Sequence, residues 1–426
     1  MELKPFQIRG AHFLAARARA LLADEPGVGK TPQLIEACNI VGADRIMVVC
    51  PSIGVEHWRR EFRKWFTIFG KAIAPQFEVI PWDDAHKLRG QLPGPGKAPM
   101  QWDVLIADES HFGKNPQARR TKAVFGKGGL GWYARRIWAA SGTPAPNNVG
   151  ELWPLLRAFG KVGMDQEQFV RHFCHVDDAG KVRGNRADRI AELRGILDSF
   201  TLRRKKRDVL PELGEIDIQE WYVKPSAEFA RQFKFGSEAL HEESQLRAEL
   251  EGKSPEDLLA FLAGDQEFAT LRRYNALLKA PAVFETVKFE LENGLLDKVV
   301  IYGYHKEALK ALHDAFWRAG ITATLIYGET PPAARDNLIE SWKRSGTVML
   351  ASIPIASTVL DFTCAHQGIM LELDWVPGNN LQAMQRMHRH GQQNPVTVRV
   401  AIGTPVDEIV SDVVLRKTRD LAEIFD

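Results

Sequence analysis

The stretch Ala-Asp-Glu-Pro-Gly-Val-Gly-Lys-Thr at residues 23–31 decides the fold, because its glycine-rich turn joins an apolar run to a helix-like run. Such a turn at the start of a helix exposes backbone N–H groups that can cradle phosphates. In this pattern Gly27 and Gly29 form the turn, Lys30 reaches the β- and γ-phosphates, and the Thr31 hydroxyl ligates Mg²⁺. The stretch predicts a nucleotide site, and a glycine-rich turn with a surface lysine is the alternative.

A second motif, Asp-Glu-Ser-His at residues 108–111, directly follows the apolar run 104–107. A carboxylate at the carboxyl end of a parallel strand lies where ligands bind in such sheets. We therefore expect Asp108 to hold Mg²⁺ and Glu109 to orient and deprotonate an attacking water. Acidic residues commonly follow strands, so this motif becomes specific only because the glycine-rich loop lies in the same block of the chain.

Short apolar runs rich in β-branched residues alternate with helical patterns in both halves of the chain. The predicted strands are 45–50, 77–80, 104–107, 136–140, 299–302, 322–327, 348–350, 369–371 and 396–400. This alternation indicates parallel sheets that are covered by helices on both faces, so the predicted fold class is α/β. Helical insertions are predicted at about 151–200 and 224–290.

The length of 426 residues allows two to four domains at ~100–200 residues each. We expect two, at 1–210 and 211–426. A composition of 45% hydrophobic and 26% charged residues excludes collagen and a disordered chain. No apolar run approaches the ~18–20 residues of a membrane helix. The four cysteines form no CxxC pair, which argues against a zinc site or a disulfide framework and favours a reducing compartment.

Charge is distributed unevenly along the chain. The 56 Lys and Arg nearly balance the 54 Asp and Glu, so the formal net charge of +2 does not by itself indicate a nucleic acid partner. The chain nevertheless contains two basic tracts. Residues 203–207 are all basic. Residues 112–136 contain no acidic residue and seven basic ones, Lys114, Arg119, Arg120, Lys122, Lys127, Arg135 and Arg136. Such tracts suit phosphate contacts, although a solvated surface is the usual role of a charge run.

Further motifs follow in order along the chain. They are Leu-Lys-Pro-Phe-Gln at 3–7, Cys-Pro-Ser at 50–52, Ser-Gly-Thr-Pro at 141–144, Leu-Arg-Arg-Lys-Lys-Arg-Asp-Val-Leu at 202–210, Gln-Ala-Met-Gln-Arg-Met-His-Arg-His-Gly-Gln at 382–392 and Gly-Thr-Pro-Val-Asp-Glu at 403–408. With the loop and the acidic motif, this set resembles the Swi/Snf-type ATPases of helicase superfamily two, over nearly the whole chain. Phe169, Arg171 and Cys174 resemble the compact branch that includes annealing helicases.

The resemblance implies two RecA-like lobes with ATP between them. It also implies a role for each of the following residues. Gln7 would read the adenine, and Gly27, Gly29, Lys30 and Thr31 would hold the phosphates and Mg²⁺, with Asp108 as the second metal ligand. Ser141, Gly142 and Thr143 would couple hydrolysis to lobe movement. Arg386 and Arg389 would act as arginine fingers from the second lobe, and Gln382 would lie on the same segment at the cleft.

The resemblance also implies DNA contacts that carry no sequence information, because they go to the backbone. The residues expected to make them are Ser52, Trp58, Lys114, Arg119, Arg120, Arg203, Arg204 and Thr363. The chain departs from the family at residues 356–363, where the glycines of a segment that normally touches DNA and nucleotide are missing. Asp24 stands for the first P-loop glycine, Pro26 for a methionine, and Gln385 for an acidic residue before the first finger.

These inferences predict an ATP-dependent translocase on double-stranded DNA that uses ATP and Mg²⁺. The alternatives are a strand-separating DNA or RNA helicase, and an ATP-binding interaction module with little hydrolysis. We expect a monomer without a membrane partner that relies on a separate targeting protein. The expected location is the cytoplasm and nucleoid of a bacterial or phage-infected cell, or the nucleus if the source is eukaryotic.

Overall fold

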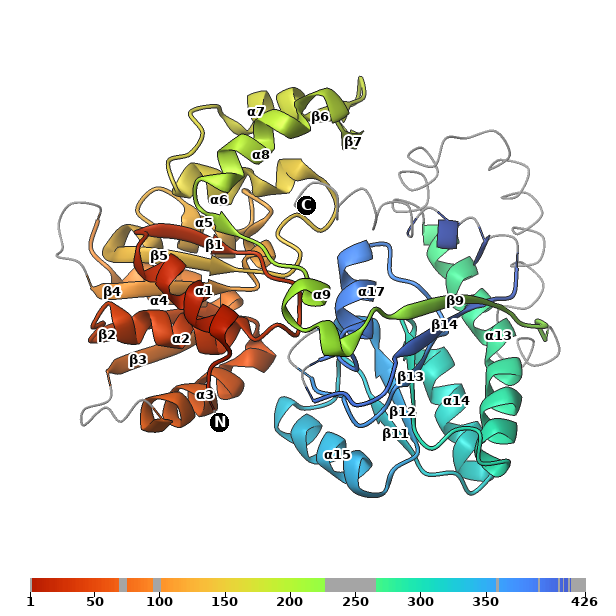
Figure 1. The fold of residues 1–426 in the computed structure, drawn as a ribbon. Helices are drawn as coiled ribbons and strands as arrows, with labels where there is room; N and C mark the ends of the chain where they lie inside the picture. Colours follow the sequence, from red (N-terminus) through yellow and green to blue (C-terminus); the bar gives the residue numbers. More distant parts are fainter. Residues whose placement is uncertain are drawn as a thin grey trace. The chain divides into compact units, whose positions relative to one another are not determined.

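The computed structural model describes residues 2–68, 75–94, 101–226, 266–357, 360–389, 391–404, 407–408, 410–412 and 414. Contacts within the chain divide it into two compact units, each described here by itself (Figure 1). Unit 1 comprises the described residues up to Pro211, and unit 2 comprises those from Glu212 onward. None of the described helices is long and apolar enough to cross a membrane.

Unit 1 contains a six-stranded parallel sheet with the strand order β3-β2-β4-β5-β1-β8. The strands are β1 Arg19–Leu22, β2 Arg45–Cys50, β3 Gln76–Pro81, β4 Trp102–Asp108, β5 Ala134–Ala140 and β8 Thr201–Leu202. Successive side chains of β1, β2 and β4 enter opposite hydrophobic clusters, as the period of two in a strand requires. Both faces are therefore buried, and the predicted α/β class with parallel sheets is confirmed.

Helices cover the two faces of this sheet. One face is packed by α1 Pro5–Ala15, α2 Lys30–Ile40 and α3 Val55–Ile68. The other is packed by α4 Ala85–Gln91, α5 Arg119–Phe125, α6 Trp153–Ala158, α7 Gln166–Phe173 and α8 Ile190–Asp198. The insertion predicted at about 151–200 is mostly helical, but it also contains an antiparallel hairpin, β6 Cys174–Val176 and β7 Val182–Asn185, which the helical interpretation missed.

Unit 2 contains a second six-stranded parallel sheet with the order β11-β12-β10-β13-β14-β9. Its strands are β9 Asp217–Tyr222, β10 Val299–Gly303, β11 Ala323–Ile326, β12 Val348–Ser352, β13 Gln367–Met370 and β14 Thr397–Ile402. Its helices are α13 Gln266–Glu292, α14 Lys306–Arg318, α15 Pro332–Ser345, α16 Ile353–Ala356 and α17 Pro377–Met384. The helix predicted at 224–290 is present as α13, whereas residues 227–265 lie outside the described residues.

The strand order of unit 1 brings three sequence motifs to one edge of the sheet. In the ladder, Ala140 at the end of β5 is paired with Leu22 of β1 on one side and with Asp108 of β4 on the other. The glycine-rich loop follows β1, the Ser-Gly-Thr-Pro segment follows β5, and Glu109 follows β4. Because the strands are parallel, all three motifs leave the sheet at its carboxyl edge, where ligands bind in such sheets.

Candidate nucleotide-binding and hydrolysis site

The glycine-rich loop forms a tight turn that ends where α2 begins. Gly27 and Gly29 have φ values of 87° and 82°, a left-handed conformation that favours glycine. Lys30 is the first residue of α2, and its ammonium group donates to the backbone oxygen atoms of Asp24 at 2.8 Å and Glu25 at 3.3 Å. The positive charge therefore lies inside the loop, where an anionic group would be bound.

Gln7 lies against this loop from α1. Its side-chain nitrogen donates to the backbone oxygen of Val28 at 3.2 Å, and its side-chain oxygen accepts from the backbone nitrogen of Lys4 at 2.9 Å. A Cβ atom on Gly29 would lie 2.5 Å from the amide nitrogen of Gln7, so only glycine allows this close approach. Thr31, in the first turn of α2, is partly exposed and offers its hydroxyl group beside the loop.

Asp24 occupies the position of the first glycine of the P-loop pattern. It is completely buried and is held by Arg204. The Nε atom of Arg204 is 3.0 Å from Oδ1 of Asp24, and its Nη2 atom donates to Oδ2 and to the amide oxygen of Gln33. The Arg204 guanidinium also lies over the Phe6 ring at 5.2 Å. Its side chain is only 14% exposed. The prediction that Arg204 contacts DNA is therefore wrong: this arginine neutralises a buried carboxylate beneath the loop.

The rest of the basic tract at 203–207 is also not a uniform surface patch. An Nη atom of Arg203 donates to the backbone oxygen of Ala23 at 3.2 Å. Lys206, in the short helix α9 Lys206–Val209, is 3% exposed, and its backbone nitrogen donates to the Glu25 carboxylate at 2.7 Å. This tract therefore packs against the glycine-rich loop. Consecutive charges in the sequence do not reveal this, because their partners come from a distant segment.

Asp108 is half-buried against two tryptophan side chains at the end of β4. Its Oδ2 atom accepts from Nε1 of Trp58 at 2.8 Å, and its backbone oxygen accepts from Nε1 of Trp82 at 2.8 Å. Burial, together with the adjacent Glu109 carboxylate, raises the pKa of Asp108 to about 6. Trp58 itself is 0% exposed. A direct contact of Trp58 with DNA is therefore a wrong prediction, and its indole instead positions the Asp108 carboxylate.

Glu109 combines backbone strain with an unsatisfied oxygen. Its φ of 45° is the only positive value among the non-glycine residues that the structure describes. Its buried Oε2 atom has no hydrogen-bond partner there and lies 3.4 Å from Nδ1 of His111. Strained backbone and unpaired buried oxygens cost free energy and are found at functional sites. This geometry agrees with an oxygen that is kept available for a reactant.

His111 joins the acidic motif to the Ser-Gly-Thr-Pro segment. Its Nδ1 atom lies 2.9 Å from the Ser141 hydroxyl oxygen, which also accepts from the Thr143 backbone nitrogen at 3.1 Å. Burial, reinforced by Lys114, lowers the pKa of His111 to about 3, so the ring is neutral. We assigned His111 no role from the sequence. The feature of the sequence that could have indicated a role for His111 is its position two residues after Glu109.

Gly142 connects the same segment to the glycine-rich loop. A Cβ atom at Gly142 would lie 2.4 Å from the ring of Pro26, so the two backbones approach more closely than any side chain would allow. Pro26 is, with Asp24, one of the two residues at which the loop departs from the family pattern. The contact shows that the segment from 141 to 143 touches the loop on one side and, through His111, the acidic motif on the other.

The donor set at this edge fits a hard divalent cation such as Mg²⁺. Asp108 and Glu109 are neighbouring carboxylates, and burial together with the Glu109 charge raises the pKa of Asp108. The Thr31 hydroxyl supplies a neutral oxygen at the start of α2. Mg²⁺ in phosphate sites is typically held by one or two carboxylates together with substrate oxygens and waters. The few oxygen donors at this edge would therefore be sufficient to hold Mg²⁺ together with phosphate oxygens and waters.

The four predicted site residues from the second half, Thr363, Gln382, Arg386 and Arg389, lie in unit 2. Gln382 and Arg386 are 3% and 4% exposed. The Arg386 guanidinium donates to the backbone oxygens of Ala356 at 3.1 Å and Ser357 at 2.6 Å, and Arg389 donates to that of Leu360 at 3.1 Å. The predicted fingers therefore hold the described part of the divergent segment 356–363. Within that segment Thr363 donates through its hydroxyl group to Asp361 at 2.9 Å.

The basic tract at 112–136 is divided between opposite edges of the unit 1 sheet. Lys114 pairs with Glu151 at 3.0 Å and Arg120 with Asp83 at 3.1 Å, while Arg119 at the start of α5 is exposed. These residues follow the carboxyl end of β4, as Ser52 follows that of β2. Arg135 and Arg136 instead lie at the start of β5, roughly 13–17 Å along the strand from its carboxyl end. The tract is therefore not one surface.

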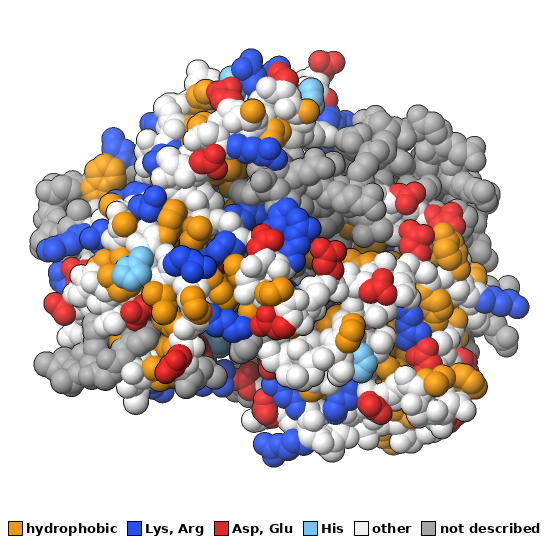
Figure 2. All heavy atoms as spheres, viewed as in Figure 1, with side chains coloured by type: hydrophobic (Ala, Val, Ile, Leu, Met, Phe, Trp, Pro, Cys, Tyr) orange, Lys and Arg blue, Asp and Glu red, His pale blue; other side chains and the backbone are white. Residues whose placement is uncertain are grey.

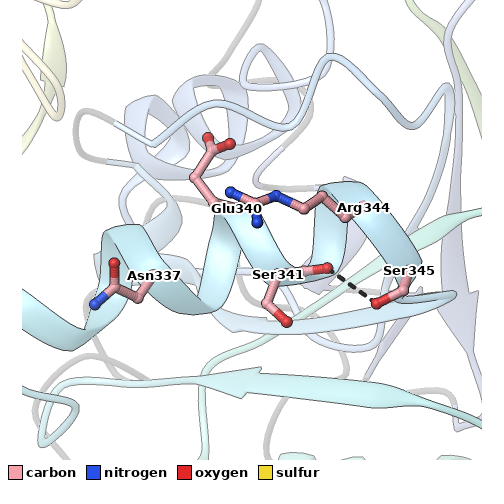
Figure 3. A pocket seen from close by; sticks show the side chains of 5 residues that line it. All are labelled: Asn337, Glu340, Ser341, Arg344 and Ser345. Carbon is pink, nitrogen blue, oxygen red and sulfur yellow. Dashed lines mark hydrogen bonds between the residues drawn. The ribbon is translucent and has the colours of Figure 1, made fainter.

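A separate hollow of about 400 Å³ lies along α15 in unit 2. It is lined by Asn337, Glu340, Ser341, Arg344 and Ser345. Figure 3 shows that all of these side chains come from one helix, with the Ser345 hydroxyl donating to the backbone oxygen of Ser341. Because no second element contributes a lining side chain, this is a surface depression rather than an assembled site.

Comparison with known proteins assigns the family. The model of the SNF2-related domain matches residues 6–75 and 96–268, which is more than half of the chain. The chain belongs to the SNF2-related family. The model of the helicase conserved C-terminal domain matches residues 282–391 of this SNF2-related chain. The resemblance to Swi/Snf-type ATPases is therefore confirmed.

Two similar proteins come from the branch predicted from the sequence. The chain is 28% identical to the SWI/SNF-related matrix-associated actin-dependent regulator of chromatin subfamily A-like protein 1 of Bos taurus, covering 99% of this chain and 44% of that protein. It is 27% identical to the DNA annealing helicase and endonuclease ZRANB3 of Mus musculus, covering 98% and 40%. The SNF2-related chain thus spans less than half the length of these relatives.

A solved structure is also similar. The Sulfolobus solfataricus SWI2/SNF2 ATPase core in complex with dsDNA has a TM-score of 0.42 and 20% identity, covering 100% of this chain and 93% of that one.

Proposed function

We propose that this SNF2-related chain is a DNA-stimulated ATPase that translocates along double-stranded DNA without sequence specificity. One observation carries the proposal: Lys30, Glu109 and Ser141 follow three adjacent parallel strands whose ends are in register. Phosphoryl transfer requires positioning and charge neutralisation more than covalent chemistry, and these groups supply both. The family assignment supports the same reaction.

In the proposed reaction the residues of unit 1 bind and orient. The ammonium group of Lys30 would exchange its contacts with loop carbonyls for phosphate oxygens, and Gln7 would contact the adenine beside Gly29. Thr31 and Asp108 would hold Mg²⁺, which supplies positive charge to the phosphates. The Oε2 atom of Glu109 would orient a water and accept its proton, because a carboxylate oxygen that accepts no hydrogen bond from the described residues is available as a base.

The proposed role of unit 2 in the reaction is to supply positive charge that stabilises the transition state. Arg386 and Arg389 would stabilise charge on the transferring phosphoryl group. Arg386 would first have to release the backbone oxygens of Ala356 and Ser357. Finger movement and the conformation of segment 356–363 are then linked, which offers a route from hydrolysis to a DNA-contacting segment despite its missing glycines.

The proposed DNA contacts lie at the carboxyl edge of the unit 1 sheet and at the divergent segment. They are Ser52, Lys114, Arg119, Arg120, Arg203 and Thr363. Backbone contacts of this kind carry no sequence information, so a separate targeting protein would choose the site of action. We propose that the chain acts as a monomer at the bacterial nucleoid, on phage DNA, or in a nucleus.

The test is ATP hydrolysis measured without nucleic acid and with single-stranded, duplex and branched DNA and with RNA. We expect strong stimulation by duplex DNA, lost in Lys30→Ala and Glu109→Gln and retained in the matched surface control Lys64→Ala. Displacement of a triplex strand without separation of the duplex would distinguish a translocase from an unwinding helicase. A rate that duplex DNA does not stimulate and that survives Lys30→Ala would contradict the proposal and favour an interaction module.

A further inference from the structure

The amino edge of the unit 1 sheet, opposite the loop and the acidic motif, carries a row of arginines. Arg19 and Arg45 are the first residues of β1 and β2, and Arg135 and Arg136 lie at the start of β5. These strands and β4 are neighbours in the order β2-β4-β5-β1. Arg17 lies two residues before β1. We call these five residues, Arg17, Arg19, Arg45, Arg135 and Arg136, the amino-edge arginine row.

Two residues of the row are exposed, and two acidic residues of the described part of the chain lie beside it. Arg45 is exposed and the Arg135 side chain is 68% exposed. The acids beside the row are Asp44 and Asp103, and Asp103 is partly occupied by the chain itself. Its Oδ2 atom accepts from the backbone nitrogens of Asp44 and Arg45, each at 3.0 Å, while Nε of Arg135 is 3.7 Å from Oδ1. Among the described residues, the five arginines of the row thus outnumber these two acids.

One backbone contact joins two arginines of the row. An Nη atom of Arg19 donates to the backbone oxygen of Arg135 at 3.0 Å, which ties β1 to the start of β5. The Arg17 guanidinium lies over the Phe13 ring at 3.8 Å. Lys127, in the loop that enters this edge before β5, is exposed and adds another charge. In Figure 2, several Lys and Arg side chains lie at the left margin of unit 1, together with Asp, Glu and hydrophobic side chains.

An exposed indole accompanies the charges. Trp132 lies in the 3₁₀ turn Leu130–Tyr133 that leads into β5, and it is 52% exposed, whereas its neighbour Tyr133 is 2% exposed. The Trp132 backbone nitrogen donates to the backbone oxygen of Gly129 at 2.9 Å, so the turn that presents the ring is hydrogen-bonded. A large aromatic ring left in water beside arginines is the combination that single-stranded nucleic acids bind, by stacking and by phosphate contacts.

We propose that the amino-edge arginine row and Trp132 bind a single strand of nucleic acid, at a surface separate from the nucleotide site. From β1 to β2 the row spans about 14 Å, since neighbouring strands lie about 4.8 Å apart. This length suits a few successive phosphates of one strand. The arginines would contact successive phosphates, and Trp132 would stack on an unpaired base. An acidic protein would use the charges but not the indole.

The surface is independent of the proposed ATPase chemistry, because β4 places about 20 Å between its first residue, Trp102, and Asp108. It offers a motor on duplex DNA a place to retain a displaced or unpaired strand. The inference rests on the fold of unit 1 and would stand even if hydrolysis proved slow.

The test is anisotropy of a fluorescent single-stranded oligonucleotide bound to the full chain across a salt series. Replacing Arg45, Arg135 and Arg136 together by Gln should reduce the slope of log K against log salt by about 2, because each single-strand phosphate contact contributes about 0.7. Trp132→Ala should weaken binding about tenfold with the slope unchanged, because stacking releases no counterions. Duplex-stimulated hydrolysis should stay as in the wild type in both variants.

The matched control removes three exposed arginines elsewhere, Arg63, Arg171 and Arg318, each replaced by Gln, and should leave affinity and slope unchanged. An unchanged slope in the row variant would overturn the proposal. Equal weakening by the control would also overturn it, since net charge alone would then explain binding. If Trp132→Ala has no effect and polyglutamate competes as well as the oligonucleotide, the surface takes an acidic protein and the nucleic acid assignment is wrong.

Discussion

Arg204 forms a two-pronged ion pair with Asp24 across 180 residues of sequence. Asp24 is completely buried beneath the glycine-rich loop, and Arg204 lies near the end of unit 1. Gln33 completes the arrangement, because its side-chain nitrogen donates to Asp24 at 3.1 Å and to the backbone oxygen of Gly29 at 3.0 Å. The last segment of unit 1 is therefore connected to the loop by charged hydrogen bonds.

Breaking this pair should destabilise the protein. Asp24→Ala leaves the Arg204 guanidinium largely buried without its counter-charge, and loss of one partner of a buried pair costs about 3–5 kcal/mol. Urea unfolding should report this loss, and nucleotide affinity should fall with it because the loop loses its support. Arg207→Ala removes an exposed arginine from the same tract and should change stability by less than about 0.5 kcal/mol. Similar effects of the two substitutions would refute a structural role for the pair.

Glu109 should show a conflict between stability and activity. Glu109→Gly relieves the left-handed strain at φ 45° and should raise the free energy of unfolding by about 1 kcal/mol while abolishing hydrolysis. Glu109→Gln keeps the strain, so it should lose turnover without this gain, and both variants should still bind nucleotide. Chemical unfolding and steady-state hydrolysis measured on the same preparations separate the two effects. A Gly variant less stable than the Gln variant would show that the strain has been misassigned.

Asp108 should make the nucleotide-free protein less stable as the pH rises. Its pKa is about 6 when folded, above the ordinary carboxyl value, so the folded state retains a proton that the unfolded state has lost. The free energy of unfolding therefore decreases between about pH 4 and 6. Asp108→Asn should be more stable than the wild type by roughly 1–2 kcal/mol at pH 8, and this advantage should vanish near pH 4. Thermal unfolding across this range, with Asp83→Asn as an exposed control, measures it.

His111 should have the opposite dependence. The pKa of His111 in the folded state is about 3, below the ordinary value of 6.5. Between these two pH values the unfolded state therefore binds a proton that the folded state does not bind. The wild type should therefore lose stability as the pH falls from 6.5 towards 3. His111→Gln, which retains hydrogen-bonding groups for Ser141, should lose about 2 kcal/mol less over that interval. Parallel acid unfolding curves for the two proteins would mean that His111 is not desolvated.

The two predicted fingers should differ in their structural contribution. Arg386 is 4% exposed and satisfies the backbone oxygens of Ala356 and Ser357, so Arg386→Ala should cost about 2 kcal/mol. Arg389 is more exposed and contacts only one of the described carbonyls of the divergent segment, that of Leu360, so Arg389→Ala should cost less than about 1 kcal/mol. Both should lose turnover. Equal unfolding curves for the variants would argue that Arg386 does not hold segment 356–363.

The sequence by itself determined the α/β class, the family and nine of the described strands, but not β1, β6, β7, β8 and β9. Buried parallel strands are continuous apolar runs, and a glycine-rich turn before a helix is a local pattern, so both can be recognised within a short window. β1 escaped because its residues, Arg-Ala-Leu-Leu at 19–22, include good helix formers and no β-branched residue. Its position between β5 and β8 provides the hydrogen bonds that make it a strand.

Only the tertiary structure decided what the individual charges and aromatic residues do. Arg204 and Trp58 were both predicted to touch DNA, yet one neutralises Asp24 and the other donates to Asp108. The tract at 112–136 is contiguous in sequence but is divided between two edges, because α5 and β5 carry the chain back across the sheet. Charge along a sequence reports neither burial nor partners, since strand order decides which distant segments meet.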